Sequence, residues 1–247
     1  MKALAMLTIA MVSNIALEGC GGAGGNPGSV TTASQGLWIG TTNANRATTG
    51  LVFSDGTFYF FYSAPGDASI IAGVVQGSGS SAGNTFSSTD AKDFNLEGDG
   101  VLDAIMSVNF TPKQSFNGTA TYTTVNATTF TSNYDAGYET KPLLATLAGK
   151  FTGQVALSGH VESAAVTVLA NGVVSGNSSG CSLSGSAAPR TDGNAYNISI
   201  TFGANPCIFA NQTLTGVAYF NSVKKQLYAA APNAARTDGF LFVGSKP

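Results

Sequence analysis

The sequence predicts an all-β protein made of two tandem antiparallel up-and-down β-barrels of about eight strands each. Glycine accounts for 31 of the 247 residues and charged residues for only 10%, against a typical charged fraction of about 25%. Ser, Thr, Asn and Gly fill the polar positions instead, while the abundant Thr, Val, Phe and Tyr favour strands. Strand-like runs recur roughly every 8 to 14 residues between Gly, Asn, Asp and Pro turn signals. They fall in equal numbers on either side of a short helical segment.

The first half of the chain contains eight expected strands, several of which alternate in period two. They cover residues 37–41, 48–53, 57–63, 70–77, 84–94, 104–110, 116–123 and 128–134. The pair Asp55-Gly56, between the second and third strands, is the strongest hairpin signal, because it accepts the positive φ angles that a tight turn requires.

Residues 139–148 (ETKPLLATLA) are expected to join the halves through a helix of one or two turns. Thr140 is expected to cap this helix, Pro142 falls in its first turn, and its three leucines share one side. Eight further strands are expected at 151–157, 164–170, 173–177, 182–188, 196–202, 214–220, 226–231 and 239–244. We expect the last hairpin to turn at Asp238-Gly239.

The two halves share three landmarks, which indicate a two-fold internal repeat. The matched segments are GLWIG at 36–40 with GKFTG at 149–153, Asp55-Gly56 with Asn171-Gly172, and residues 116–122 with residues 214–220. Chance similarity between Gly- and Thr-rich strands is the alternative explanation.

Eight short antiparallel strands in about 100 residues suit a barrel that closes on itself and leaves no exposed edge. An aromatic residue in the first strand, Trp38 or Phe151, flanked by glycines would plug one end of each barrel. This opening strand and the strand count resemble avidin-like and lipocalin-like barrels and the barrel domains of transferrin-binding-type surface lipoproteins. A pair of β-sandwiches is the alternative. Whether the barrels are packed or hollow depends on the sizes of their interior side chains.

The N-terminus carries the features of an export signal. Lys2 precedes a mostly apolar stretch at 3–17, which is shorter than the roughly 20 residues of a membrane-spanning helix and suits a secretory signal. Cys20 follows in the sequence Leu-Glu-Gly-Cys, so the segment resembles a bacterial lipoprotein signal, with Glu18 as its one departure from that pattern. The resemblance implies cleavage before Cys20, acylation of Cys20 with palmitate or a similar chain, and anchoring in a membrane. Gly21 after the cysteine implies the outer membrane of a Gram-negative bacterium. An ordinary secreted protein is the alternative.

These features divide the chain into five parts. They are a lipoprotein signal peptide with its helix (1–19), a Gly- and Ser-rich tether (20–34), an N-terminal barrel (35–138), a short helical linker (139–148) and a C-terminal barrel (149–247). The tether has no large side chain to bury and is expected to be flexible.

The other two cysteines are expected to form a disulfide bond. Cys181 precedes one predicted strand and Cys207 follows the next, so both lie near the same end of one hairpin, within reach of each other. A disulfide agrees with an oxidising compartment outside the cytoplasm. Two buried free thiols are the alternative.

The sequence offers little catalytic or metal-binding chemistry. His160 is the single histidine and is expected in a solvated loop, and no Gly-x-Ser-x-Gly segment leads from an expected strand into a helix, as a nucleophile turn would. One loop in which oxygen ligands alternate is expected to be a solvated turn, with a weak calcium site as the alternative. Its ligands would be Asn95, Glu97, Asp99 and Asp103. The formal net charge is −2 and the single basic pair is Lys224-Lys225, so we expect no nucleic-acid partner and no cofactor.

The run Phe58-Tyr59-Phe60-Phe61-Tyr62 is the sharpest local anomaly. Strand alternation sends Phe58, Phe60 and Tyr62 to one face and Tyr59 and Phe61 to the other. One set fills the core. The other set, Tyr59 and Phe61, is then a candidate surface for packing between the domains, for a partner protein or for a small ligand.

Together these features predict a lipid-anchored, non-catalytic protein of the cell envelope. We expect it to contact the membrane through its N-terminal lipid and to bind or adhere to a protein or small ligand through loops on rigid barrels. An inhibitor of periplasmic enzymes or an envelope scaffold is the first alternative, and a hydrolase is the second.

Overall fold

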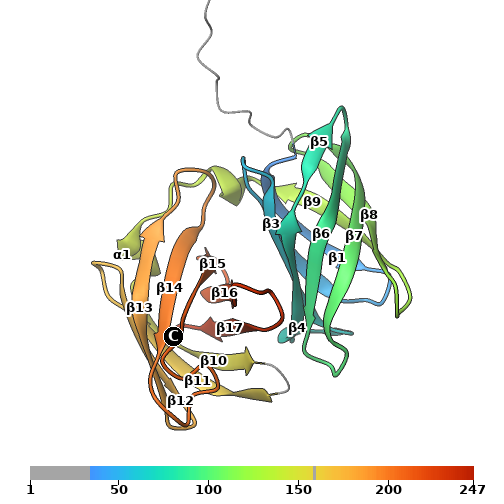
Figure 1. Ribbon diagram of the computed structural model, residues 1–247. Helices are drawn as coiled ribbons and strands as arrows, with labels where there is room; N and C mark the ends of the chain where they lie inside the picture. The colour runs from blue at the N-terminus through green and yellow to red at the C-terminus, as the bar shows by residue number, and fades with distance from the viewer. Residues whose placement is uncertain (1–33, 158–159) are drawn as a thin grey trace, which may run out of the picture.

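The computed structural model describes residues 34–157 and 160–247, which form two closed antiparallel barrels that lie side by side (Figure 1). The expected signal peptide, Cys20 and nearly all of the tether lie outside the described residues. The first barrel contains β1 (Gly36–Thr42), β2 (Ala47–Val52), β3 (Thr57–Ala64), β4 (Asp67–Ser78), β5 (Ser80–Ala82), β6 (Thr85–Asn95), β7 (Gly100–Thr111), β8 (Ser115–Tyr122) and β9 (Thr128–Asp135). The second contains β10 (Gly149–Leu157), β11 (His160–Val168), β12 (Val173–Ser178), β13 (Cys181–Pro189), β14 (Tyr196–Phe202), β15 (Thr213–Asn221), β16 (Gln226–Pro232) and β17 (Gly239–Ser245).

The first barrel closes through two non-consecutive pairs, β1 with β9 and β4 with β6. The short strand β5, which was not predicted, prolongs β4 beyond Gly79, and both pair with β6: Gln76 lies opposite Lys92 and Ser80 opposite Ser87. The barrel therefore has eight strand positions around its circumference, and one of them is shared by β4 and β5, which are separated at Gly79. The sequence of β5, Ser-Ser-Ala, has no hydrophobic alternation, which is the signal that predicts a strand.

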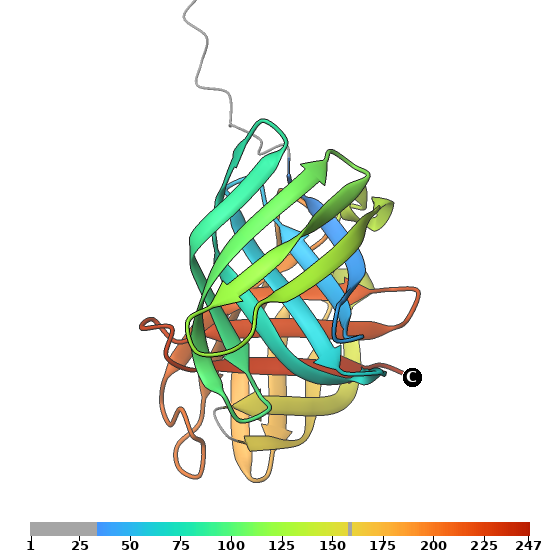
Figure 2. The same cartoon turned by 90° about the vertical axis from the view of Figure 1, so that its right-hand side faces the viewer.

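The second barrel is an uninterrupted meander in which β17 pairs back with β10. The predicted pair of tandem eight-stranded barrels is thereby confirmed, and the β-sandwich alternative is excluded, because a sandwich leaves its two sheets unjoined at their edges. Strands of the two barrels cross steeply where the barrels meet (Figure 2).

The connection between the barrels holds a single turn of helix, the shorter of the two lengths expected. It holds a 3₁₀ turn, η1 (Ala136–Glu139), and a single turn of helix, α1 (Leu144–Leu147). Thr140 terminates η1 instead of capping α1, and Leu143, in extended conformation, precedes the helix without a side-chain cap. Pro142 biases Lys141 toward extended backbone, so no helix continues from η1 into this segment.

Two of the three repeat landmarks occupy equivalent positions in the two barrels. Asp55-Gly56 and Asn171-Gly172 both form the second hairpin, with φ of +82° at Gly56 and +86° at Gly172. In each barrel the glycine carbonyl of this turn accepts a hydrogen bond from the chain one strand further on. The donor is Gly79 N–H, between β4 and β5, at 3.0 Å in the first barrel and Ala187 N–H, in β13, at 2.7 Å in the second. The third landmark, residues 116–122 with residues 214–220, is wrong by one strand. With β4 and β5 counted as one position, β8 is the seventh strand of its barrel, whereas β15 is the sixth.

The Gly-x-aromatic-x-Gly segments mark the closing seam of each barrel. Trp38 and Phe151 point into the barrels and are fully buried. The second glycine of each segment faces the last strand so closely that an added Cβ would lie 1.9 Å from Thr131 O at Gly40 and 2.0 Å from Val243 O at Gly153. Both seams therefore require a residue without a side chain.

The two interiors are filled differently. In the first barrel, Phe116 lies at the centre of an aromatic cluster, with ring centroids of five neighbours 5.1–6.4 Å away. These neighbours are Trp38, Phe60, Phe86, Phe110 and Phe130. The middle of the second barrel is instead filled mainly by valine, isoleucine, leucine and alanine.

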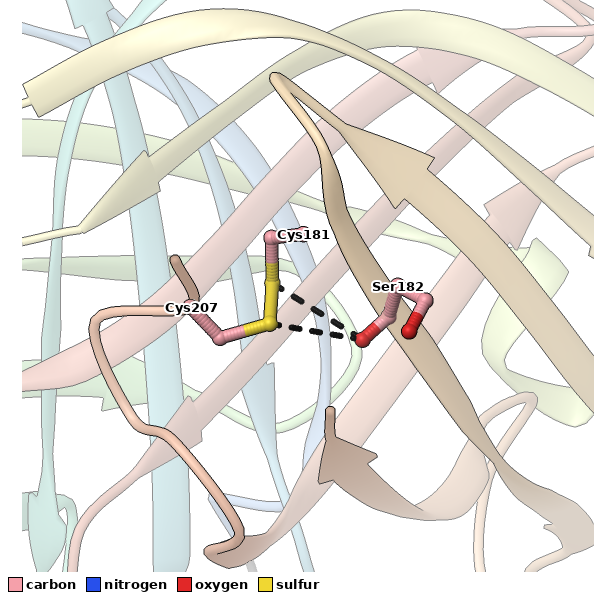
Figure 3. Close-up of a disulfide and its surroundings, with 3 residues drawn as sticks. All are labelled: Cys181, Ser182 and Cys207. Atoms are coloured by element: carbon pink, nitrogen blue, oxygen red, sulfur yellow. Dashed lines mark hydrogen bonds between the residues drawn. A yellow bond between two sulfur atoms is a disulfide. The ribbon is translucent and has the colours of Figure 1, made fainter. Parts of the chain in front are cut away.

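The predicted disulfide joins Cys181, at the start of β13, to Cys207 in the loop after β14, with a Cα–Cα distance of 4.7 Å. Figure 3 shows both sulfur atoms beside the carbonyl oxygen of Ser182. The bond closes a segment with a sequence separation of 26, for which the chain-entropy model gives about 3 kcal/mol of stabilisation.

Replacing Gly153 by alanine tests the seam of the second barrel. Because the new Cβ would overlap Val243 O, β10 and β17 must separate locally, and we expect the free energy of unfolding to fall by about 1–3 kcal/mol. Urea unfolding measures the change. Thr152→Ala, on the exposed outer side of the same strand, is the matched control and should stay within about 0.5 kcal/mol of the wild type. Equal stability of the two variants would contradict the seam assignment.

Candidate functional site

The two barrels meet through a continuous apolar contact. The first barrel contributes outward-facing side chains such as Leu51, Phe61 and Val74, and the second contributes side chains such as Tyr219 and Leu241. In Figure 1 the strands β3 and β4 face β16 and β17 across this contact. Burial of this apolar surface favours a fixed arrangement of the two barrels over independent motion.

The aromatic run in β3 alternates as predicted. Phe58 and Phe60 point into the first barrel, whereas Tyr59 and Phe61 are 6% and 2% exposed in the contact between the barrels. The ring of Phe61 lies 5.5 Å from that of Tyr228 in β16. The candidate partner surface formed by Tyr59 and Phe61 is therefore covered by the second barrel itself.

An arginine from the second barrel donates hydrogen bonds to the first barrel across this contact. Arg236 lies in the loop between β16 and β17, and its guanidinium donates to Gln76 O at 2.8 Å, to Asp90 O at 2.6 Å and to the Asp90 carboxylate at 2.7 Å. The predicted turn at Asp238-Gly239 is wrong in detail, because the loop spans 233–238 and the residue with positive φ is Arg236. This longer loop is what carries the arginine across to the first barrel.

A second polar network joins the two barrels next to the linker. Asp192, from the loop between β13 and β14, accepts hydrogen bonds from the N–H (3.1 Å) and hydroxyl (2.8 Å) of Ser54 in the first barrel. Arg190 pairs with Asp192 at 2.9 Å and lies over the ring of Phe53, 3.9 Å from its centroid. Asn194 adds a hydrogen bond to Gly137 O at 3.0 Å.

A cleft of about 770 Å³ opens beside this network. It is lined by Gln35 and Ser54 of the first barrel, by the linker residues 138–142, and by residues 189–193 of the second barrel. Two cationic side chains, Lys141 and Arg190, and two anionic ones, Glu139 and Asp192, belong to its walls. Hydrogen bonds from Lys113 and Tyr134 lower the pKa of Glu139, so this carboxylate stays ionised. The cleft therefore presents fixed charges of both signs in a hollow of the size typical of ligand sites.

The linker-side cleft was not predicted from the sequence. Its polar residues lie in turns, and a turn residue such as Ser54 or Asp192 has the same local signal whether it faces water or another domain. Only the docking of the two barrels brings these turns together.

A buried carboxylate lies inside the first barrel, near the end where β6 turns into β7. Asp93 is 4% exposed and accepts hydrogen bonds from the hydroxyls of Tyr62 (2.7 Å) and Tyr122 (2.8 Å). Burial raises the pKa of Asp93 to about 6, and the two hydroxyl donors and nearby Arg46 offset part of this rise. Arg46 itself is paired with Glu97 at 2.6 Å at the same end of the barrel.

Three of the four candidate calcium ligands, Asn95, Glu97 and Asp103, have other partners. Glu97 pairs with Arg46, and Asp103 pairs with Lys92. Asn95 accepts hydrogen bonds from the backbone N–H of Glu97 and Asp99. Within residues 34–157 and 160–247, no group of three or more His, Cys, Asp or Glu side chains is placed to hold a metal ion.

His160 begins β11 and is exposed. Hydrogen bonds from Ser178 and Ser179 lower the pKa of nearby Glu162, and the histidine contributes a smaller effect in the same direction. In a hydrolytic triad the imidazole bridges the carboxylate and the serine, whereas here the serines bond directly to the carboxylate. This grouping therefore lacks the connectivity that activates a serine.

No helix in the described ranges is long and apolar enough to cross a membrane.

The likeness of this chain to known proteins is structural and distant. Neither a protein-family model nor a curated protein sequence matches this chain. The fold is similar to the crystal structure of the isotype 1 transferrin binding protein B from serogroup B Neisseria meningitidis, with 10% sequence identity and a TM-score of 0.29. The match covers 81% of this chain and 66% of that one. That protein is of the transferrin-binding type with which the opening strand and strand count were compared.

The pH dependence of stability tests the burial of Asp93. Its ordinary pKa of 3.8 applies to the unfolded chain, and the folded value is about 6. As the pH rises from about 4 to about 6, the unfolded chain loses this proton first. The carboxyl group therefore lowers the free energy of unfolding progressively, by about 3 kcal/mol above pH 6.

Asp93→Asn removes this titration while keeping groups that can hydrogen-bond to both tyrosines. We expect the stability of the variant relative to the wild type to increase by about 3 kcal/mol between pH 4 and pH 7, as measured by urea unfolding at each pH. Asp67→Asn, at an exposed position in β4, is the control. A pH-independent difference between Asp93→Asn and the wild type would show that burial does not raise this pKa.

Proposed function

We propose that this chain is a lipid-anchored protein of the cell envelope, and that its two locked barrels bind a partner protein or ligand in the linker-side cleft. The observation that carries this proposal is the construction of the cleft. Its walls come from the first barrel, the linker and the second barrel together, and the bonds between Ser54 and Asp192 hold them in place. A preformed polar hollow between two rigid bodies binds a partner without an ordering cost of its own.

The envelope location is supported by two features of the chain. The Leu-Glu-Gly-Cys sequence that ends at Cys20 follows an apolar stretch and precedes a Gly- and Ser-rich tether, as in a lipoprotein. The disulfide between Cys181 and Cys207 agrees with folding in an oxidising compartment. A tether of this kind would hold the barrels at a distance from the lipid surface.

A binding role agrees better with the cleft than a catalytic one does. The lining contains no histidine or cysteine, and its anionic side chains are held by arginine, lysine or tyrosine partners. Glu139 is a poor general base, because its hydrogen bonds from Lys113 and Tyr134 lower its pKa. Inhibition of a periplasmic enzyme would use the same cleft and differs from adhesion only in the identity of the partner.

Metabolic labelling tests the anchor. Cells that express the wild-type chain should incorporate labelled palmitate into it, and the Cys20→Ala variant should carry no label, because the acylated thiol is absent. A Cys181→Ala variant is the control for loss of a cysteine and should keep the label. Label on Cys20→Ala at the wild-type level would refute the anchor without affecting the cleft.

Site-specific photo-crosslinking in intact envelopes tests the cleft. A photoreactive residue at Thr191, which is exposed and lines the cleft, should give a discrete crosslinked species. The same residue at Thr213, which is exposed on β15, is the matched control and should give none. Equal products from the two positions, or none from Thr191, would count against the cleft as the binding site.

A further inference from the structure

The second barrel encloses an apolar cavity of about 30 Å³. Its thirteen lining residues are all hydrocarbon: valines, leucines, isoleucines, three alanines and two phenylalanines. No polar atom faces it. The cavity lies along the barrel interior, bordered by Val168 and Leu147 as well as by Ile200 and Phe240.

The cavity exists because small residues occupy central positions of this barrel. Ala187, Ala218 and Ala229 point inward from three different strands. The first barrel fills the corresponding space with Phe116 and the rings around it. Two barrels of the same strand number therefore differ in whether their interior is full.

Water is a poor occupant of this space. A water molecule needs roughly 10–15 Å³ and two to four polar partners, and an apolar cavity of sufficient size stays dry and takes up apolar atoms or molecules instead. The cavity exceeds this volume but offers no hydrogen-bond partner. An apolar occupant would recover the dispersion contacts that its walls lack.

The two ends of the barrel differ in how they are closed. At one end the loop after β14 is tied by the disulfide and packs Phe209 against Phe202 at 5.4 Å. At the other end the cover is the single turn α1, whose Leu147 is 1% exposed and lines the cavity. Side chains hold α1 through its backbone carbonyls: the Tyr196 hydroxyl donates to Leu143 O at 2.9 Å, and Lys246 Nζ donates to Thr146 O at 2.8 Å.

We propose that the second barrel is a binding site for a small apolar molecule without hydrogen-bonding groups, and that this molecule enters at the end covered by α1. The site is separate from the linker-side cleft, since it is internal and uncharged. The volume limits the ligand to a few heavy atoms. Opening at α1 breaks a few hydrogen bonds and exposes Leu147, whereas opening at the opposite end is restrained by a covalent bond.

Xenon is the probe, and the whole chain with labelled methyl groups is equilibrated with it at increasing pressure. We expect methyl resonances of Val168, Leu183 and Leu227, which line the cavity, to shift saturably. Methyl groups inside the first barrel, such as those of Val75 and Val108, serve as an internal control and should not shift. Unshifted cavity methyls, or equal shifts in both barrels, would overturn the proposal.

A matched pair of variants separates filling of the cavity from general damage to β13. Ala187→Val adds two methyl groups to the cavity wall, whereas Ala188→Val adds them to the exposed outer face of the same strand. Saturable shifts should be lost in Ala187→Val and kept in Ala188→Val, with the spectrum of the first barrel unchanged in both. If Ala187→Val keeps the wild-type response, xenon occupies another place and the proposal fails.

Exchange kinetics test the entrance. Tyr196→Phe removes the hydroxyl that holds Leu143 O, so the exchange rate of bound xenon, measured by saturation transfer, should rise several-fold. Tyr228→Phe, in the contact between the barrels, is the control and should leave the rate unchanged. An unchanged rate in Tyr196→Phe would show that α1 is not the entrance.

Discussion

Closure of each sheet on itself is the constraint on which the rest of this structure depends. A barrel whose first strand does not reach its last exposes two edges, and unpaired edges invite association with other chains. Here each seam passes through a glycine, Gly40 in one barrel and Gly153 in the other, and neither position has room for a Cβ. The low charge of the chain makes closure more important, because few Lys or Glu side chains are available to protect an open edge.

Once the barrels are closed, the sizes of the inward-facing residues decide whether the interior of each barrel is filled or keeps a cavity. The first barrel is filled by a tryptophan and a cluster of phenylalanines, and it contains a buried carboxylate, Asp93, that accepts hydrogen bonds from two tyrosines. The second is filled largely by aliphatic residues and keeps a dry cavity. The same topology thus produces a rigid packed body and a body with internal space, because strand number sets the radius while side-chain volume sets the filling.

The contact between the barrels creates the site proposed for binding. The contact contains an apolar cluster, and polar networks around Arg236 and Arg190 add bonds between the barrels. Both arginines lie in loops between strands, so the loops connect the barrels while the strands shape them. A cleft whose walls are joined by these bonds keeps its geometry in the absence of a partner. A preformed binding surface of this kind avoids an entropic cost on association.

Local sequence determined the elements of this protein more fully than their assembly. Alternation in β3 placed Phe58 and Phe60 inside and Tyr59 and Phe61 outside, Asp55-Gly56 marked a hairpin, and the spacing of Cys181 and Cys207 indicated their bond, because each of these depends on near neighbours in one strand or hairpin. The repeat was recognised from its seam glycines but misaligned at β8, since Gly- and Thr-rich strands resemble one another whatever their position. Only the tertiary structure decided three other features. They are the outer face that the second barrel covers, the partners of Arg236 and Asp192, and the difference in filling between the two barrels. These features depend on contacts between residues more than a hundred positions apart, or on the sum of volumes around a closed ring, and neither leaves a periodic signal in the sequence.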